Sequence, residues 1–302
     1  MPKIEYVSKK FSASTLAIIK DAEAIIAEYQ AQGFSLTLRQ LYYQFVARDL
    51  IPNTEQSYKR IGSIISDARR AGLIDWSAIV DRTRALRKLS FWSSPYDMLV
   101  SARDSYHRDL WATQDLRMEV WIEKDALIGV IQKVCQDNDV PFFSCRGYVS
   151  DSEMWAGAVR EIQHRESDQN VIILHLGDHD PSGIDMTRDI TERLDLFSFR
   201  GDIEVRRIAL TMEQVEELGP PPNPAKITDS RYDSYAALYG NESWELDALE
   251  PQYIANLIGE HILAERDDDR WQVAVQEQED ERAQLTNLLD RWNELFGESE
   301  EA

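Results

Sequence analysis

The sequence predicts an α/β protein with an all-α, winged helix-turn-helix N-terminal region, a mainly parallel sheet flanked by helices, and an acidic C-terminal helix. Three observations predict this order. Apolar residues recur at helical spacing through residues 13–71. From residue 118 onward, short apolar segments alternate with amphipathic ones, which is typical of strands and helices around a parallel sheet. Residues 252–296 are rich in acidic residues and carry an apolar stripe at helical spacing.

Three helices are expected over residues 13–33, 38–49 and 55–71, with Thr37 capping the second and glycines ending the first and third. Short turns between them indicate a helix-turn-helix layout, and residues 73–80 are a candidate wing. The third helix and the segment after it are basic, as a DNA-reading element requires. The candidate DNA-binding residues are Lys59, Arg60, Arg69, Arg70, Arg82 and Arg84. The alternative is an ordinary three-helix packing unit with a solvated basic face.

The alternating region places acidic residues after two of its strands. Strands are expected over residues 118–122, 140–144, 171–176 and 203–210, with helices over 126–135, 153–164 and 182–196. Functional groups of a parallel sheet gather beyond the carboxyl ends of the strands. Glu123 follows the first strand, and Asp178 and Asp180 follow the third. If these two strands are neighbours, the three carboxylates can converge.

Glu123, Asp178 and Asp180 are therefore candidate metal ligands. Mg²⁺ prefers hard oxygen ligands and keeps several waters, so carboxylates beside a phosphate suit it. Taken alone, the segment after the third strand is typical of a turn and helix cap, but Glu123 at an earlier strand end favours the metal site. His179 is open between a contact to phosphate or metal and a helix cap. Asp185 is open between a supporting acid and an exposed helix residue.

The net charge of -21 is distributed unevenly along the chain. Residues 1–90 carry 14 Lys and Arg against 9 Asp and Glu, whereas the remaining residues carry 19 against 45. DNA is therefore expected at one face only. Cys135 and Cys145 match no disulfide framework and no zinc spacing. Since no segment approaches the ~20 apolar residues of a membrane helix, we expect a cytoplasmic protein without a membrane part.

Several motifs together resemble the Toprim domain of topoisomerases, primases and some nucleases. They are Glu123-Lys124 at a strand end, Gly147 after the second strand, and Asp178-x-Asp180 before Gly183. In detail they are most similar to the A subunit of topoisomerase VI and the related meiotic double-strand-break proteins. The segment 244–249 resembles one that follows the Toprim core in that family. The resemblance covers residues 35–90 and 118–260, and it implies Mg²⁺ at the three acids. Lys124 is open between a contact to the scissile phosphate and a pair with Asp178.

The same family cleaves DNA through a tyrosine in an Arg-x-x-Tyr-Tyr type motif ahead of Toprim. Residues 37–43 read Thr-Leu-Arg-Gln-Leu-Tyr-Tyr, so the resemblance implies that Tyr43 is the nucleophile and Arg39 its neighbouring phosphate-binding cation. Arg39 lies four residues before Tyr43 and therefore on the same helix face. A phenol of pKa about 10 is a weak nucleophile and needs such help. The alternative is a core role: Tyr42 and Tyr43 point in different directions around a helix, and one of them is expected to be buried.

The resemblance also implies a division of the chain and a set of partners. The predicted parts are a winged-helix DNA-binding and cleavage domain over residues 1–90, a connecting helical segment over 91–117, a Toprim metal-binding domain over 118–262 and the acidic helix over 263–302. The implied partners are double-stranded DNA and a second copy, with tyrosine and metal supplied by different subunits of a homodimer. Because the chain has no phosphate-cradling ATPase motif, it implies either a separate ATPase subunit or a reduced stand-alone form.

Two other functions remain open at this point. The protein is a hydrolytic Toprim nuclease if water attacks the phosphate and Tyr43 only packs or grips DNA. It is a non-catalytic DNA-binding protein if the acids keep the fold but support no turnover.

Overall fold

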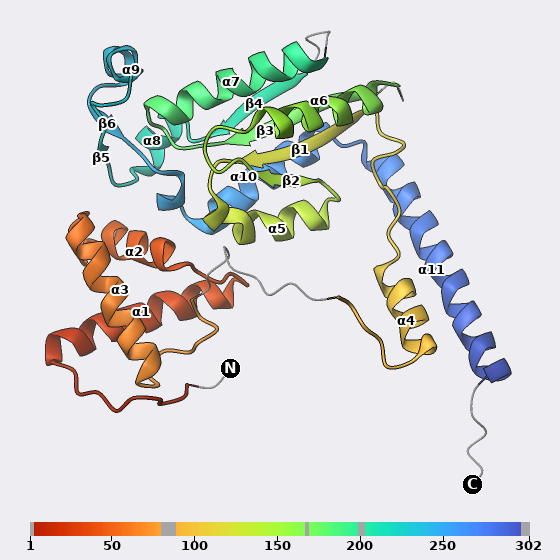
Figure 1. Ribbon diagram of the computed structural model, residues 1–302, viewed down its shortest axis with the longest axis horizontal. Coiled ribbons are helices and arrows are strands. Elements are labelled where there is room, and N and C mark those ends of the chain that lie inside the picture. Colours follow the sequence, from red (N-terminus) through yellow and green to blue (C-terminus); the bar gives the residue numbers. More distant parts are fainter. Residues whose placement is uncertain (1–2, 80–88, 167–168, 199–202, 297–302) are drawn as a thin grey trace.

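A computed structural model of the chain describes residues 3–79, 89–166, 169–198 and 203–296 (Figure 1). A three-helix unit lies beside a parallel sheet covered by helices on both faces, and a pair of helices extends away from the sheet. The predicted α/β class with a parallel sheet flanked by helices is confirmed.

The three-helix unit consists of α1 (Ala13–Ala31), α2 (Leu38–Ala47) and α3 (Glu55–Arg70). Each helix begins at a hydroxyl cap: Ser12, Thr37 and Thr54 accept hydrogen bonds from backbone N–H groups of the first turn. Apolar faces of the three helices meet in one buried cluster that is separate from the clusters of the sheet.

The predicted wing falls partly on residues outside the described ranges. Over residues 73–79 the structure has turns and an isolated bridge between Leu36 and Ile79, and residue 80 is not described. The segment is fixed by Arg69, whose guanidinium donates to the carbonyl oxygens of Trp76 at 2.6 Å and Ile79 at 3.2 Å. The wing therefore stays a prediction.

The sheet contains four parallel strands in the order β2-β1-β3-β4. Their bounds are β1 Leu116–Ile122, β2 Phe142–Ser144, β3 Asn170–Leu176 and β4 Glu204–Ala209. The central pair β1 and β3 is in register over the whole of β1, from Leu116 opposite Asn170 to Ile122 opposite Leu176. The strands that carry Glu123 and Asp178 at their ends are therefore direct neighbours, as the metal-site hypothesis requires.

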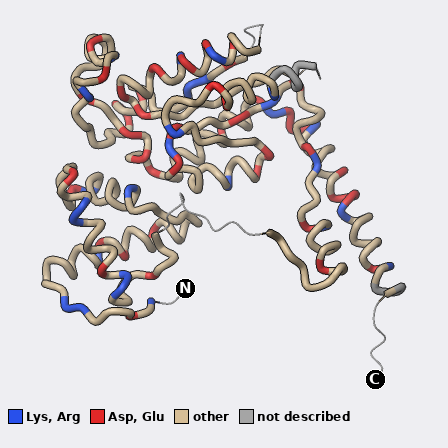
Figure 2. The backbone as a smooth tube through the Cα atoms, in the orientation of Figure 1, with Lys and Arg blue, Asp and Glu red and all other residues tan. Residues whose placement is uncertain are grey.

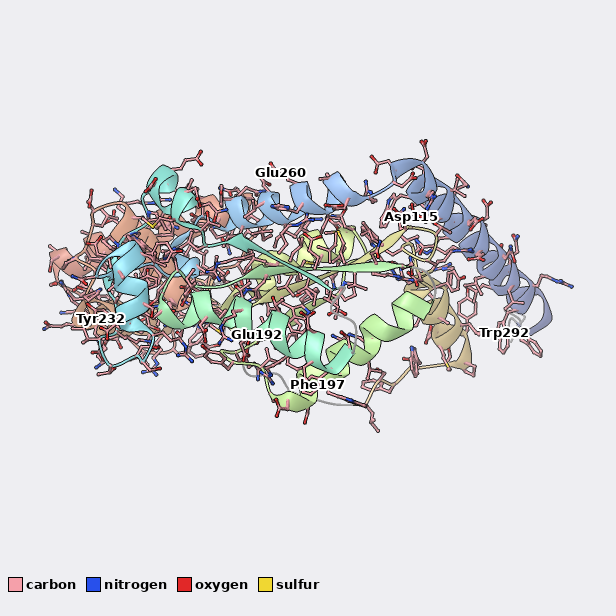
Figure 3. The ribbon with its side chains drawn as sticks, turned by 90° about the horizontal axis from the view of Figure 1, so that it is seen from above. Asp115, Glu192, Phe197, Tyr232, Glu260 and Trp292 are labelled. Atoms are coloured by element: carbon pink, nitrogen blue, oxygen red, sulfur yellow. The ribbon has the colours of Figure 1, made fainter. Side chains whose placement is uncertain are left out.

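Helices cover both faces of this sheet. One face packs against α6 (Asp151–Glu166) and α7 (Pro181–Ser198), and the other against α5 (Ile128–Asp137) and α10 (Pro251–Glu265). Figure 3 shows Glu192 of α7 and Glu260 of α10 on opposite sides of the strands. Alternation along β1 explains this: Met118, Val120 and Ile122 are buried toward one face and Trp121 toward the other.

The acidic C-terminal region forms two helices instead of the single helical stretch expected over residues 252–296. The break lies at Arg266 and Asp267, where Arg266 has extended backbone and an Asp267 carboxylate oxygen accepts from the Arg270 N–H at 3.0 Å, which caps the next helix. That helix, α11 (Asp268–Phe296), packs along α4 (Pro95–Ser105), and both extend from the body (Figures 1 and 3).

The remaining short elements gather at the carboxyl end of the sheet. They are the 3-10 turns η1 (Asp125–Leu127) and η2 (Leu246–Ala248), helices α8 (Met212–Leu218) and α9 (Tyr232–Tyr239), and the two-stranded pair β5 (Asn223–Pro224) and β6 (Glu242–Ser243). The three-helix unit contacts this end of the molecule through α2 and η2.

Several contacts join the three-helix unit to the sheet region, among them one apolar contact and two hydrogen bonds. Ala248 of η2 lies inside the apolar cluster of the three helices and is 7% exposed. The Tyr29 hydroxyl of α1 donates to Glu250, and the Asn53 amide donates to Asn223 at 2.9 Å. The apolar contact of Ala248, with a hydrogen bond on either side of it, therefore fixes α2 against η2.

Replacing Ala248 by Arg should separate the two parts without unfolding either one. The change places an unpaired cation in an apolar cluster, which costs several kcal/mol. We expect a larger radius of gyration in small-angle scattering, with the helical circular-dichroism signal retained. Ala237→Arg, on the exposed side of α9, is the matched control and should leave the radius unchanged. An unchanged radius for Ala248→Arg would contradict the described packing.

Candidate functional site at the carboxyl end of the sheet

Two of the predicted acids meet at the ends of β1 and β3. A carboxylate oxygen of Glu123 accepts a hydrogen bond from the Asp178 N–H at 2.8 Å. The two residues come together because β1 and β3 are paired up to Ile122 and Leu176, immediately before them. Burial raises the pKa of both carboxyl groups, and each lies close enough to the other acids of the site to feel their charge.

Asp180, the third predicted acid, caps α7. Its Oδ1 accepts from the Ser182 hydroxyl at 2.9 Å and from the Gly183 N–H at 2.6 Å. The turn is tight: a Cβ on Gly183 would lie 2.2 Å from the Asp178 carbonyl oxygen, so only glycine fits there. The helix-cap interpretation of this segment therefore describes what Asp180 does in the structure, while it still lies beside Glu123.

Lys124 is at the centre of a cluster of carboxylates. Its ammonium lies 2.9 Å from Asp178, 2.8 Å from Glu245 and 2.8 Å from Asp247. The Lys124 side chain is 15% exposed and that of Asp247 is fully buried. Burial lowers the pKa of Lys124, but the attraction of Asp247, Asp178 and Glu245 outweighs it, so the pKa lies above its ordinary value and the amine is charged.

Glu245 and Asp247 reach this cluster through pairing of distant backbone segments. His179 and Trp244 exchange two backbone hydrogen bonds at 2.8 and 3.0 Å. Two residues after Trp244, the Leu246 N–H donates to the Asp178 carboxylate at 2.8 Å. These three bonds place the segment 244–247 along the loop after β3.

His179, which the sequence left open, is a buried neutral residue of this junction. It is 1% exposed, its Nδ1 is 2.8 Å from the Tyr235 hydroxyl, and its ring packs edge-on against Tyr239 and Trp244. Burial and Arg207 lower its pKa to about 4. Asp185, also left open, is held by Tyr148, Arg188 and Arg231.

The predicted tyrosine and arginine join the same cluster from α2. The Arg39 guanidinium forms ion pairs with Glu245 and, at 3.1 Å, with Asp247. Its central carbon lies 5.8 Å from the centre of the Tyr43 ring. Tyr43 and Glu245 line the same pocket beside this guanidinium. Residues predicted as two separate groups thus form one network within a single chain.

Both tyrosines of the pair are buried, each 4% exposed, whereas burial was expected for one of them. The reason is that α2 packs on two sides, against α1 and α3 and against η2. The Tyr42 hydroxyl donates to Asn53 at 2.9 Å and Thr54 at 3.1 Å, which fixes the turn before α3. For Tyr43, burial and then Glu245 and Asp247 raise the pKa, while Arg39 acts in the opposite direction.

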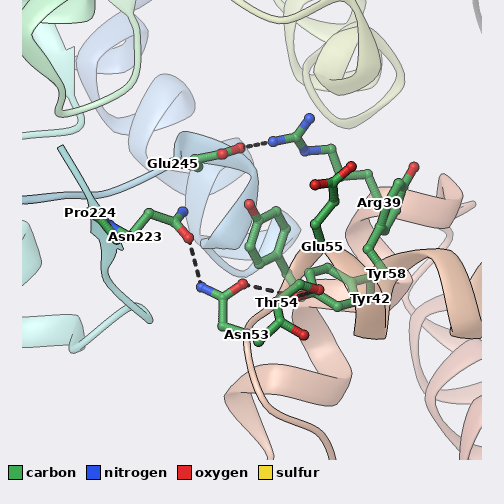
Figure 4. A pocket seen from close by; sticks show the side chains of 10 residues that line it. Arg39, Tyr42, Asn53, Thr54, Glu55, Tyr58, Asn223, Pro224 and Glu245 are labelled. Atoms are coloured by element: carbon green, nitrogen blue, oxygen red, sulfur yellow. Dashed lines mark hydrogen bonds and ion pairs between the residues drawn. The ribbon is translucent and has the colours of Figure 1, made fainter. Parts of the chain in front are cut away.

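A pocket of about 380 Å³ opens beside this network (Figure 4). Its lining includes Arg39, Tyr42 and Tyr43 of α2, Glu55 and Tyr58 of α3, and Glu245. Figure 4 shows Arg39 and Glu245 joined at one side and Asn53 and Asn223 joined at another. The pocket is large enough for a phosphate group and reaches the predicted nucleophile.

The three predicted metal ligands match Mg²⁺ in chemistry, because all three offer carboxylate oxygens. In each of the three, one carboxylate oxygen also accepts a hydrogen bond from a backbone N–H group of the protein. In the described part of the chain, no group of three or more His, Cys, Asp or Glu side chains is gathered as a metal would require. The donor set fits the ion, and its present arrangement is fixed by the Lys124 ion pair and the α7 cap.

The candidate DNA-binding residues divide into three groups. Lys59, Arg60 and Arg70 are exposed on α3, with Lys59 paired to Glu55. Arg69 is used by the turn after α3, as described above, and its guanidinium also stacks 4.5 Å from the Trp76 ring. Arg82 and Arg84 lie outside the described residues. Figure 2 shows the basic residues of the three-helix unit on one side of the molecule and the acidic residues of α11 on the other.

Sequence reasoning gave no role to Glu245, Asp247 or Arg207. The first two were signalled by the family-like segment 244–249, but its charges were not assigned to the site. Arg207 on β4 is partly buried, and its guanidinium donates to the carbonyls of Gly177 at 3.0 Å and Asp178 at 2.7 Å. Burial lowers its pKa to about 10. The available signal was the pair Arg206-Arg207 within the predicted strand 203–210.

No protein-family model, no curated protein and no solved structure matches this chain. The likeness to the topoisomerase VI A family therefore depends on the motifs alone. In the described residues, none of the helices combines the length and the apolar character needed to cross a bilayer.

His175 on β3 predicts a pH dependence of stability. It is fully buried, its Nδ1 lies 2.8 Å from the Thr187 hydroxyl, and burial with Arg207 lowers its pKa to about 3. In the unfolded chain a histidine has a pKa of about 6.5. The unfolded state therefore binds this proton first, and stability present above pH ~6.5 is lost as the pH falls toward 3.

Between pH 7 and pH 5, His175 should lower the free energy of unfolding by about 2 kcal/mol. Urea unfolding at both pH values, for the wild type and His175→Gln, measures this. The variant keeps a polar partner for Thr187 but does not titrate, so it should lose about 2 kcal/mol less than the wild type. An equal loss in both proteins would contradict the assignment.

Proposed function

We propose that this protein cleaves duplex DNA by transesterification, with Tyr43 as nucleophile and Mg²⁺ bound by Glu123, Asp178 and Asp180. The observation that carries the proposal is the junction of two sets of residues in one chain. Arg39 of the three-helix unit pairs with the carboxylates that surround Lys124, and the Tyr43 ring lies beside the Arg39 guanidinium. A phenol, two cations and a set of acids at the edge of a parallel sheet are suited to phosphoryl transfer.

Each residue has a definite part in the proposed reaction. The Tyr43 oxygen forms a bond to phosphorus and the bond from phosphorus to one sugar oxygen breaks. The phenol gives up its proton to solvent, and the leaving sugar oxygen takes a proton from solvent to become a hydroxyl. Arg39 and Lys124 hold the negative charge of the phosphate. When bound, the metal would neutralise further charge on the phosphate. The reverse reaction restores the DNA strand, because the phosphotyrosine bond keeps the energy of the phosphodiester.

The three-helix unit is proposed to be a winged-helix module and the sheet region a Toprim domain. The exposed Lys59, Arg60 and Arg70 of α3 would then contact DNA phosphates. The proposed site is built within one chain and does not use the two-subunit arrangement that the resemblance implies. By the same resemblance we still propose a homodimer and either a separate ATPase subunit or a reduced stand-alone enzyme.

A hydrolytic nuclease is the second candidate, and the burial of Tyr43 favours it. A phenol that is 4% exposed and has a raised pKa attacks poorly. In that case water is the nucleophile, and Tyr43 packs beside Arg39.

One plasmid assay with Mg²⁺, run with and without protease before the gel, tests the proposal. Transesterification should give linear or nicked DNA that is released only after proteolysis. Tyr43→Phe should lower the amount of covalent adduct at least 100-fold, because the nucleophilic oxygen is absent. Tyr58→Phe, in the same pocket, should retain it.

The remaining outcomes separate the alternatives. Normal nicking by Tyr43→Phe together with loss in Asp178→Ala would establish the hydrolytic nuclease instead. Salt-sensitive DNA binding without cleavage by the wild type would reduce the protein to a DNA-binding module.

A further inference from the structure

A single carboxylate stands where the substrate of the proposed reaction must bind. Glu245 accepts from the Arg39 guanidinium and from the Lys124 ammonium, and it lines the same pocket as Tyr43, whose ring lies beside that guanidinium. These are the two cations and the nucleophile that a scissile phosphate has to contact. A phosphate oxygen cannot reach both cations while the Glu245 carboxylate lies between them.

The neighbouring Asp247 binds the same two cations but differs in exposure. Its side chain is fully buried, with Lys124 at 2.8 Å and the Arg39 Nε at 3.1 Å. The Glu245 side chain is 24% exposed and lines the pocket. Asp247 is therefore fixed, whereas Glu245 has free space into which it can turn.

The backbone around Glu245 is held independently of its side chain. Trp244 is paired with His179, and the Leu246 N–H is bonded to Asp178. Rotation of the Glu245 side chain would consequently leave the segment and the Lys124–Asp247 pair in place.

We propose that Glu245 occupies a phosphodiester subsite formed by Arg39, Lys124 and Tyr43, and that the backbone phosphate of DNA displaces it. The inference depends on the proposed function for the identity of the substrate. It adds that the Glu245 carboxylate imitates the charge of that substrate. The subsite beside Tyr43 is therefore occupied by an anion of the chain itself until DNA binds.

Charge favours replacement over addition. Two cations, Arg39 and Lys124, face three carboxylates, those of Asp178, Glu245 and Asp247. A fourth anion in this low-dielectric cluster would be repelled. A phosphodiester carries one negative charge, as a carboxylate does, so exchange keeps the total charge constant. The planar guanidinium of Arg39 binds two oxygens of either group equally well.

The experiment measures binding without cleavage. A fluorescent duplex oligonucleotide of mixed sequence is titrated, without Mg²⁺, into Tyr43→Phe and into Tyr43→Phe with Glu245→Gln. The second protein lacks the competing charge but keeps the side-chain shape, so its Kd should be about tenfold lower. Inorganic phosphate should compete for that oligonucleotide more effectively with the second protein than with the first.

Glu242→Gln, in the same Tyr43→Phe background, is the matched control, because Glu242 is exposed on β6. It removes the same net charge and should change the Kd less than twofold. If Glu245→Gln does not fold, Glu245→Asp withdraws the carboxylate by one methylene and should also lower the Kd.

An unchanged or higher Kd for the Glu245 variants would overturn the subsite. So would a drop equal to that of Glu242→Gln, which would reflect net charge only. Loss of the covalent adduct in Glu245→Gln with unchanged binding would instead assign Glu245 to proton transfer. Because binding is read without turnover, failure of the wild type to form an adduct would overturn the proposed function and leave the displacement measurable.

Discussion

The structure of the site depends on one buried ammonium group shared by three carboxylates. Lys124 follows β1 and Asp178 follows β3. Glu245 and Asp247 come from a segment that lies about 120 residues after Lys124 in the sequence. Buried charges are expensive unless they are paired, so this cluster stabilises the fold mainly by excluding other arrangements of the strand ends. Arg39 extends the cluster to α2 and thereby joins the three-helix unit to it.

This constraint gives the resting molecule a definite chemical state. The cations that suit a phosphate are already neutralised, and Tyr43 is buried beside Arg39. Under the proposed function, DNA would have to displace a carboxylate from these cations before cleavage could begin. The pocket beside Glu245 and the free space around its side chain are where this displacement is proposed to start.

The sheet could be predicted from the sequence because its signals are local. Apolar runs such as 171–176 read as strands, and the acids after them were expected at one edge of the sheet. The pairing of Glu123 with Asp178 followed from the neighbouring strands β1 and β3.

What could not be predicted depends on contacts between distant segments. Glu245 and Asp247 join the site through the His179–Trp244 bridge, which no local pattern encodes. Both tyrosines are buried because α2 is covered on a second side, whereas helical periodicity assumes one buried face. The helix cap by Asp180 was one of the two interpretations that the sequence allowed, and the tight turn at Gly183 shows that Asp180 has this role in the structure.

The central claim is that Lys124 and Asp247 are energetically coupled within this buried cluster. A double-mutant cycle of Lys124→Met and Asp247→Asn, read as free energies of unfolding in urea, measures the coupling directly. Each single change removes one partner of a buried charge whose other partners remain and should cost about 2 kcal/mol, while the double variant should cost less than the sum by at least ~1 kcal/mol. Additive effects, within ~0.5 kcal/mol, would contradict the account.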